Sequence, residues 1–156
     1  MNHVTPPPPL PVRGTYRMSL TLGEHSARHL RFILRAYLGS WGMGELRDCA
    51  ELALTELGTN VVRHVPDRRC DLLILRRPQG LRVEVADRCP RLPRQGGGGG
   101  EELDEGGRGL LIVEAVTDRC GFEPWADGAG KTAWFECDAK GDGTCDAADA
   151  GPTRSA

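Results

Sequence analysis

The chain has 156 residues, of which 39% are hydrophobic and 27% charged, and its formal net charge is −2. This length suffices for one domain with a sizeable core, and the slightly acidic balance argues against a nucleic-acid-binding face, so we expect no direct contact with nucleic acid. No apolar run approaches the roughly 20 residues that cross a bilayer, and the start of the chain does not resemble a signal peptide. Six scattered cysteines without a Cys-x-x-Cys pair favour buried thiols over a zinc site or a disulfide framework. We therefore expect a cytoplasmic protein that does not contact a membrane.

The first 40 residues are predicted to contain a leader, a strand and a helix. Residues 1–14 include four consecutive prolines, which predict a disordered leader. A short edge strand is expected at Tyr16–Leu22. Apolar residues at helical spacing predict an amphipathic helix from Glu24 to about Ser40, which Gly42 and Gly44 end.

The segment from Glu45 to Val65 lacks proline and is predicted to form the central helix. Asn60 and His64 project from the same side as its apolar stripe, and Glu56 lies at the edge of that stripe. Polar groups in such places cost about 1–3 kcal/mol each when they lack partners. Two explanations stay open here: hydrogen bonds to a neighbouring sheet, or a ligand cavity where a carboxylate and an amide meet a metal-bound phosphate. The stripe consists of Leu46, Ala50, Ala53, Leu57 and Val61.

Two strands and a long loop are predicted next. Strands are expected at Cys70–Arg76 and Leu81–Ala86, around a turn at residues 78–80. Residues 88–107 contain five consecutive glycines between basic and acidic residues. Such a composition cannot form a core, so we predict a long mobile loop or lid.

The last part of the chain is predicted to hold a helix and a strand pair. The turn Gly106-Gly-Arg-Gly109 is expected to open a short apolar helix, Leu110–Val116. Strands are predicted at Arg119–Pro124 and Thr132–Cys137, and residues 138–156 are predicted to be a disordered tail. The order of elements predicts an α+β fold, a two-layer sandwich in which helices cover one face of a mostly antiparallel mixed sheet.

Two short features have a physical logic for nucleotide binding. Glycines at the start of a helix let the backbone approach a phosphate, and the first turn presents unpaired N–H groups to an anion; a plain helix start is the alternative reading of Gly106–Gly109. Asp87, at the end of a predicted strand, could accept a hydrogen bond from a base amine, or it could simply be a turn residue before Pro90.

One apparent motif is rejected. Residues 125–132 nearly match the phosphate-binding loop Gly-x-x-x-x-Gly-Lys-[Ser/Thr], but Trp125 stands at the first glycine. That loop must also open a helix, whereas Lys131 and Thr132 lead into a predicted strand.

Four segments of the chain form an ordered set. They are Glu56-Leu-Gly-Thr-Asn60-Val-Val-Arg-His64, Val83-Glu-Val-Ala-Asp87, Gly107-Arg-Gly109-Leu-Leu-Ile-Val and Gly130-Lys-Thr132. Together they resemble the ATP-binding fold of the gyrase, Hsp90, histidine-kinase and MutL type (GHKL type, or Bergerat fold). The resemblance covers about residues 15–137 and is strongest to its small branch of actinobacterial anti-sigma factors that act as serine kinases.

This resemblance implies ATP and Mg²⁺ as cofactors and gives three residues defined roles. Glu56 would be the catalytic base that activates a hydroxyl or water. Asn60 would bind the Mg²⁺ that bridges the ATP phosphates, a role that suits a hard oxygen donor. Asp87 would bond the adenine amine.

The remaining site residues come from the last two segments. Gly107, Arg108 and Gly109 would cradle phosphate beneath the lid, and Thr132 would lie near the adenine or the phosphates.

By the same resemblance, the protein would be an ATP-binding regulator and a protein serine/threonine kinase that phosphorylates a small antagonist protein. An RNA polymerase sigma factor would be a second partner, and a homodimer is one expected assembly. The alternative is a non-catalytic ATP-binding module that sequesters a sigma factor or another regulator. Glu56 favours the kinase. The replacement of the family's glycines after Asp87 by Arg88, Cys89 and Pro90 favours the alternative.

Overall fold

The computed structural model describes residues 14–92 and 105–140. Most of three predicted segments therefore lies outside the described residues. These segments are the leader, of which only residue 14 is described, the long loop and the tail.

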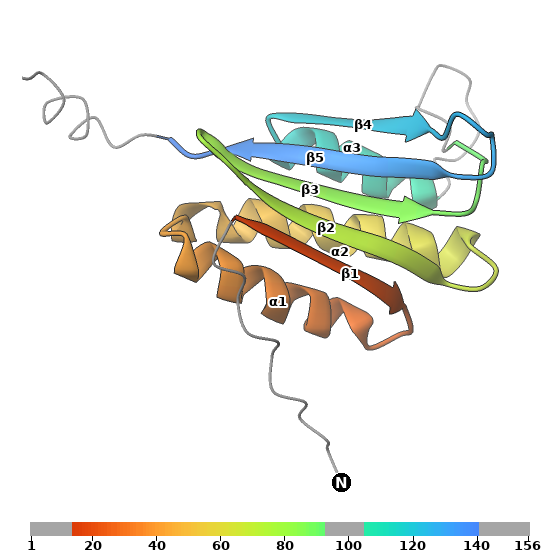
Figure 1. The fold of residues 1–156 in the computed structure, drawn as a ribbon, viewed down its shortest axis with the longest axis horizontal. Helices are drawn as coiled ribbons and strands as arrows, with labels where there is room; N and C mark the ends of the chain where they lie inside the picture. Colours follow the sequence, from red (N-terminus) through yellow and green to blue (C-terminus); the bar gives the residue numbers. More distant parts are fainter. Residues whose placement is uncertain (1–13, 93–104, 141–156) are drawn as a thin grey trace, which may run out of the picture.

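A five-stranded antiparallel sheet forms one layer of the molecule (Figure 1). The strand order is β1-β2-β3-β5-β4, with β3 in the centre, and every neighbouring pair is antiparallel. This register places Asp87, the last residue of β3, directly opposite Lys131, the first residue of β5. The strands are β1 (Thr15–Thr21), β2 (Arg69–Arg77), β3 (Gly80–Asp87), β4 (Arg119–Pro124) and β5 (Lys131–Asp138).

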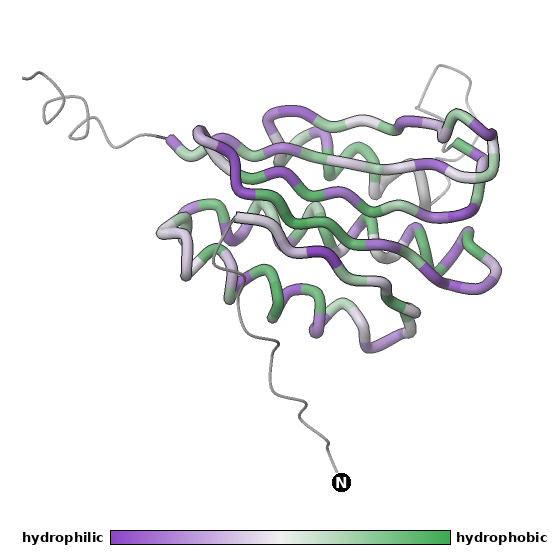
Figure 2. The backbone as a smooth tube through the Cα atoms, in the orientation of Figure 1, coloured by the Kyte–Doolittle hydropathy of each residue, from purple (hydrophilic) through white to green (hydrophobic). Residues whose placement is uncertain are grey.

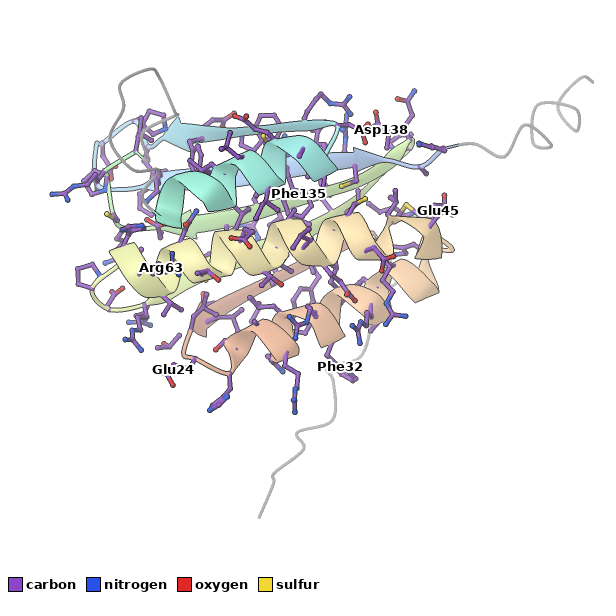
Figure 3. The ribbon with its side chains drawn as sticks, turned by 180° about the vertical axis from the view of Figure 1, so that it is seen from behind. Glu24, Phe32, Glu45, Arg63, Phe135 and Asp138 are labelled. Atoms are coloured by element: carbon purple, nitrogen blue, oxygen red, sulfur yellow. The ribbon has the colours of Figure 1, made fainter. Side chains whose placement is uncertain are left out.

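Three helices form the second layer and cover one face of the sheet, as the view from behind shows (Figure 3). They are α1 (Ser26–Ser40), α2 (Arg47–His64) and α3 (Glu105–Val116), and a single 3₁₀ turn at Gly44–Leu46 leads into α2. The central helix α2 packs against both α1 and α3. The predicted α+β two-layer sandwich is confirmed, and the sheet is antiparallel throughout its described strands.

The core lies between the two layers. All five residues of the predicted stripe on α2 are buried. Along the strands, alternate side chains point to the helices, which explains the period-two burial of β3 and β5. A continuous hydrophobic stretch lies in the middle of β2, next to the central strand β3 (Figure 2). In the described ranges, no helix combines the length and hydropathy that a bilayer crossing requires.

Glu51, near the start of α2, ties α1 to α2. Its carboxylate binds the guanidinium groups of Arg35 on α1 and Arg47 on α2. Hydrogen bonding from Arg35 holds the pKa of Glu51 below its ordinary value in spite of burial. Both carboxylate oxygens are engaged, so Glu51 has a structural role in helix pairing.

The open face of the sheet carries a second buried acid. Glu136 on β5 is only 7% exposed, although helices do not cover this face. Three arginines surround its carboxylate: Arg82 binds Oε1, while Arg77 and Arg119 bind Oε2. The guanidinium of Arg82 also lies 4.3 Å from the centre of the Trp134 ring. The carboxylate of Glu136 is therefore neutralised by arginines on this face, although Nε1 of Trp134 is buried there without a hydrogen-bond partner among the described residues.

Three details differ from the sequence-based expectations. The helix α3 begins at Glu105 rather than after Gly109, so the glycines lie within its first turns. A glycine costs about 1 kcal/mol in a helix, but packing of α3 on α2 favours the longer helix. His64 is exposed instead of lying on the buried side.

The thiols are also less uniformly buried than expected. Cys70 and Cys137 are buried, and burial raises the pKa of each to about 12. Cys49, in contrast, is exposed, and Cys89 and Cys120 are half-buried.

Candidate functional site

Glu56 and Asn60 lie one turn apart in the C-terminal half of α2, and both are half-buried. The amide nitrogen Nδ2 of Asn60 is fully buried and has no hydrogen-bond partner among the described residues. Leaving such a donor unpaired costs about 1–3 kcal/mol. This orphaned donor shows that the neighbouring sheet does not satisfy Asn60, which was one of the two explanations left open by the sequence.

Gly109, in the second turn of α3, lies against both of these side chains. A Cβ atom at Gly109 would be 2.7 Å from Oε2 of Glu56 and 3.8 Å from Oδ1 of Asn60. A larger residue there would have to displace the flexible end of the Glu56 side chain, so the glycine permits this close approach. The contact brings together two segments that are far apart in the sequence.

Gly107 and Arg108 belong to the first turn of α3. The first four N–H groups of a helix have no partner within the helix. Their backbone is thus in the part of α3 that can offer donors to an anion, while the side chain of Arg108 lies outside the described structure.

Asp87 is 5% exposed and forms a buried ion pair with Lys131. The ammonium Nζ of Lys131 donates to Oδ1 of Asp87 at 2.9 Å and to the carbonyl oxygen of Cys89 at 2.9 Å. The backbone N–H of Cys89 donates to the same Oδ1 at 2.9 Å. The turn that follows Asp87 is therefore part of the arrangement that holds its carboxylate.

Gly130 allows β5 to approach the end of β3. A Cβ atom there would collide with the backbone carbonyl oxygen of Asp87 and would lie 2.8 Å from two ring atoms of Trp125. Lys131 then enters the sheet facing the helices, in step with Ala133 and Phe135, which are buried in the core.

Sequence reasoning named Lys131 in a rejected motif and in the Gly130-Lys-Thr132 segment of the resemblance, but it gave this residue no role in the site. Alternation along β5 was the signal that could have found it, because Lys131 shares the parity of the buried core residues.

Thr132 lies on the other face of the sheet. Its hydroxyl accepts a hydrogen bond from Nε1 of Trp125 at 3.1 Å, and its register partners on the two neighbouring strands are Ala86 and Glu123. The structure thus brings Glu56, Asn60 and Gly109 together, and it places Asp87 at the same end of the molecule, where α3 begins (Figure 1). Thr132 does not join them.

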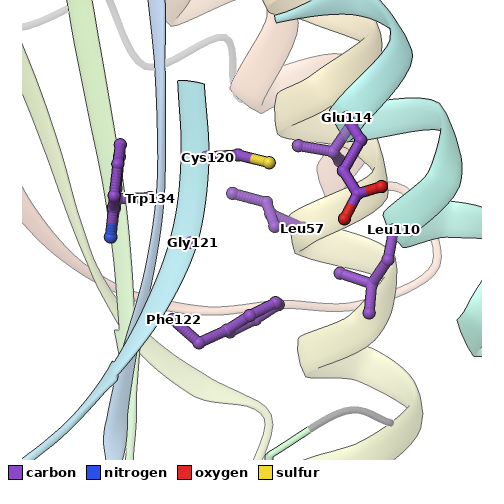
Figure 4. A pocket seen from close by; sticks show the side chains of 8 residues that line it. Leu57, Leu110, Glu114, Cys120, Gly121, Phe122 and Trp134 are labelled. Atoms are coloured by element: carbon purple, nitrogen blue, oxygen red, sulfur yellow. The ribbon is translucent and has the colours of Figure 1, made fainter. Parts of the chain in front are cut away.

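Two cavities lie beside this site rather than in it. The first, between α3 and β4, has a volume of about 10 Å³, which is room for at most one water molecule. Leu57, Leu110 and Phe122 line it, and Trp134 lies across β4 and β5 from the helices (Figure 4). The second, of about 240 Å³, lies between the start of α1 and α2. Neither is lined by Glu56, Asn60 or Asp87.

A comparison with known protein families identifies the family to which this chain belongs. Residues 21–136 match the family described as "Histidine kinase-like ATPase domain". The chain belongs to this family. The match includes every candidate site residue named above, and membership implies that this ATPase domain binds ATP.

A solved structure has the same fold. It is the crystal structure of the RsbU and RsbW domains of Rv1364c from Mycobacterium tuberculosis, with a TM-score of 0.55 and 20% sequence identity. The alignment covers 79% of this chain and 32% of that chain, so this ATPase domain corresponds to about a third of that protein's length. A comparison with curated proteins gave no match.

The residues of this ATPase domain fit ATP and Mg²⁺. The Asn60 side chain offers a hard oxygen donor of the kind that Mg²⁺ prefers, and its buried Nδ2 is a donor without a partner. Gly109 keeps the space beside Glu56 free of a side chain. At Asp87, the described hydrogen bonds both end on Oδ1, so Oδ2 remains an acceptor for a ligand donor.

Proposed function

We propose that this ATPase domain is a Mg²⁺- and ATP-dependent protein serine/threonine kinase of the anti-sigma factor type, which phosphorylates a small antagonist protein. The observation that carries the proposal is the contact of Gly109 with Glu56 and Asn60, together with the orphaned amide of Asn60. A carboxylate and an unsatisfied amide beside the start of a helix are the groups that phosphoryl transfer needs.

Each site residue receives a role in the proposal. Asn60 would hold the Mg²⁺, and Gly107, Arg108 and Gly109 would hold phosphate at the start of α3. Asp87 would accept a hydrogen bond from the adenine amine through Oδ2. Bound Mg²⁺-ATP would supply the transferable phosphoryl group and the neutralising charge.

Glu56 would act on the acceptor hydroxyl of the substrate protein. The serine oxygen would pass its proton to the Glu56 carboxylate and form a bond to the γ-phosphorus. As that bond forms, the bond from the γ-phosphorus to the bridging oxygen breaks, and this oxygen stays with ADP. Proton transfer by a positioned side chain contributes typically about 10²–10⁴-fold to a rate.

The partners in this proposal are a small antagonist protein, as substrate, and an RNA polymerase sigma factor that the domain sequesters, within a cytoplasmic homodimer. The shared fold with a structure that contains an RsbW domain supports this assignment. Thr132 is left outside the site, because its hydroxyl is bound to Trp125 on the opposite face of the sheet.

A second candidate is an ATP-binding module that sequesters its partner without phosphorylating it. The replacement of the family's glycines after Asp87 by Arg88, Cys89 and Pro90 favours this candidate, because their side chains stand where the nucleotide would approach the backbone.

Substitution of Glu56 separates the two candidates. We expect Glu56→Gln to leave the Kd for Mg²⁺-ATP within about twofold and to lower phosphate transfer by at least about 10²-fold. Transfer is measured with γ-labelled ATP and candidate antagonist proteins, and binding by calorimetric titration. Glu51→Gln, on the same helix but in the α1–α2 ion pair, is the matched control and should retain transfer. Transfer that survives Glu56→Gln, or a parallel loss of binding and transfer, would contradict the role of Glu56.

A further inference from the structure

The carboxylate of Asp87 is bound by its partners in a different way from the carboxylates of the other two buried acids. Glu51 and Glu136 each have both oxygens bound by arginines. At Asp87, by contrast, both described hydrogen bonds end on Oδ1. One oxygen of this buried carboxylate is thus held by the protein, and the other has no partner among the described residues.

Two donors fix the rotation of the Asp87 carboxylate, and a third hydrogen bond joins them to each other. Lys131 and the N–H of Cys89 both donate to Oδ1, and Lys131 also donates to the carbonyl oxygen of Cys89. These bonds form a closed triangle of Asp87, Cys89 and Lys131. Rotation of the carboxylate would break both of its described hydrogen bonds, so Oδ2 is kept in one position.

The identity of the cation matters for this geometry. A lysine ammonium is a compact donor that can bind a single oxygen, whereas the planar guanidinium of arginine can bind both oxygens of a carboxylate at once, as Arg35 does at Glu51. Arginine holds Glu51 and Glu136, where the pairs tie elements together. Lysine is the residue that neutralises Asp87 while leaving one of its oxygens available.

We propose that Lys131 is a positioning residue that selects adenine: it holds Asp87 through Oδ1 so that Oδ2 is presented as an acceptor for the 6-amino group of the base. This inference rests on the proposed function, because it requires ATP to bind with its base at Asp87. An ionised carboxylate can only accept hydrogen bonds. A base that carries hydrogen or a carbonyl oxygen in place of the amine offers no donor at that position, and such an absence leaves a buried polar group unpaired.

The experiment compares two nucleotides that differ only in the 6-amino group. The Kd values of ATP and of purine riboside 5′-triphosphate are measured with the full chain in Mg²⁺, for the wild type and for Lys131→Arg and Lys131→Met. We expect the wild type to bind ATP at least about tenfold more tightly than the analogue, a ratio typical of one lost hydrogen bond to a charged group.

The two variants are expected to lose this preference for different reasons. Lys131→Arg preserves the charge but covers both oxygens of Asp87, so the preference for ATP should fall below about threefold while the Kd of the analogue hardly changes. Lys131→Met removes the bond that fixes the carboxylate and should also lose the preference, with a lower Tm. The control is Arg119→Met, which removes a cation from the open face of the same sheet and should keep the wild-type preference.

The outcomes distinguish this inference from the function on which it rests. If Lys131→Arg keeps the wild-type preference, or weakens binding of both nucleotides equally, Lys131 only braces the sheet and the inference is overturned while ATP binding stands. The inference is also overturned, and ATP binding again stands, if the wild type binds both nucleotides equally. If the wild type binds neither, the proposed function fails, and this inference fails with it. If Lys131→Met does not fold, the comparison of the wild type with Lys131→Arg still tests the inference.

Discussion

Two buried acids, Asp87 and Glu136, stand on opposite faces of the same sheet and are neutralised in different ways. Glu136 is enclosed by three arginines that bind both of its oxygens. Asp87 has a single lysine and a backbone N–H, both on one oxygen. A buried acid with every lone pair engaged has nothing left to offer a ligand, so the difference separates a structural ion cluster from a binding group.

The largest expected effect comes from removing the single cation that pairs with Asp87. Lys131→Met leaves a carboxylate that is 5% exposed without its counter-charge, and breaking such a buried pair costs about 3–5 kcal/mol in the free energy of unfolding. Glu136→Gln leaves three arginines whose side chains are 21% to 46% exposed. Water can hydrate these guanidinium groups after the substitution, so we expect Glu136→Gln to lower the free energy of unfolding by only about 1–2 kcal/mol. Urea unfolding of both variants measures the two losses, and the reverse order would contradict this comparison.

The pH dependence of stability sharpens the contrast further. Burial would raise the pKa of Glu136, but hydrogen bonds from Arg119 and Arg82 outweigh burial and hold it below 4.5. An acid with a lowered pKa in the folded state stabilises the fold above its unfolded pKa and loses this effect as pH falls through its folded pKa. We therefore expect the stability difference between wild type and Glu136→Gln to be full at pH 7 and to shrink progressively below about pH 4.5. Urea midpoints at several pH values test this expectation, and a difference that grows in acid would refute it.

The smallest expected effect concerns Thr132. Thr132→Val removes the hydrogen bond from Trp125 and should cost about 1 kcal/mol of stability. Because the hydroxyl lies on the face away from the helices, the Kd of Mg²⁺-ATP should not change. A clear loss of ATP affinity with unchanged stability would return Thr132 to the site, as the sequence resemblance implied.

The fold could largely be predicted from the sequence, because local patterns decide it. The stripe on α2 has helical spacing, and the strands alternate with period two, so burial follows directly from the sequence. The start of α3 was missed because three glycines, Gly106, Gly107 and Gly109, have weak helix propensity. Packing of α3 on α2 stabilises them in the helix, which is a tertiary effect.

The site could be predicted only in part, for a related reason. Glu56 and Asn60 share a helix, and their spacing places them together. The pairing of Asp87 with Lys131 joins residues 44 positions apart, and it depends on the register of β3 against β5, which no local pattern contains. A shift of one residue in that register would have exchanged the faces of Lys131 and Thr132, so the sequence alone does not indicate which of the two lies beside Asp87.

The central claim is that Mg²⁺-ATP binds where α2 meets the start of α3, with Asn60 as the residue that holds the metal. It is tested most directly by calorimetric titration of Mg²⁺-ATP into the wild type and Asn60→Ala. Thr59→Ala is the control, because Thr59 is adjacent on α2 but lines the cavity beside α1. We predict that Asn60→Ala weakens binding at least about tenfold, the loss expected for one hydrogen bond or metal contact to a charged ligand, while Thr59→Ala stays within about twofold. Equal affinities of wild type and Asn60→Ala would contradict the account.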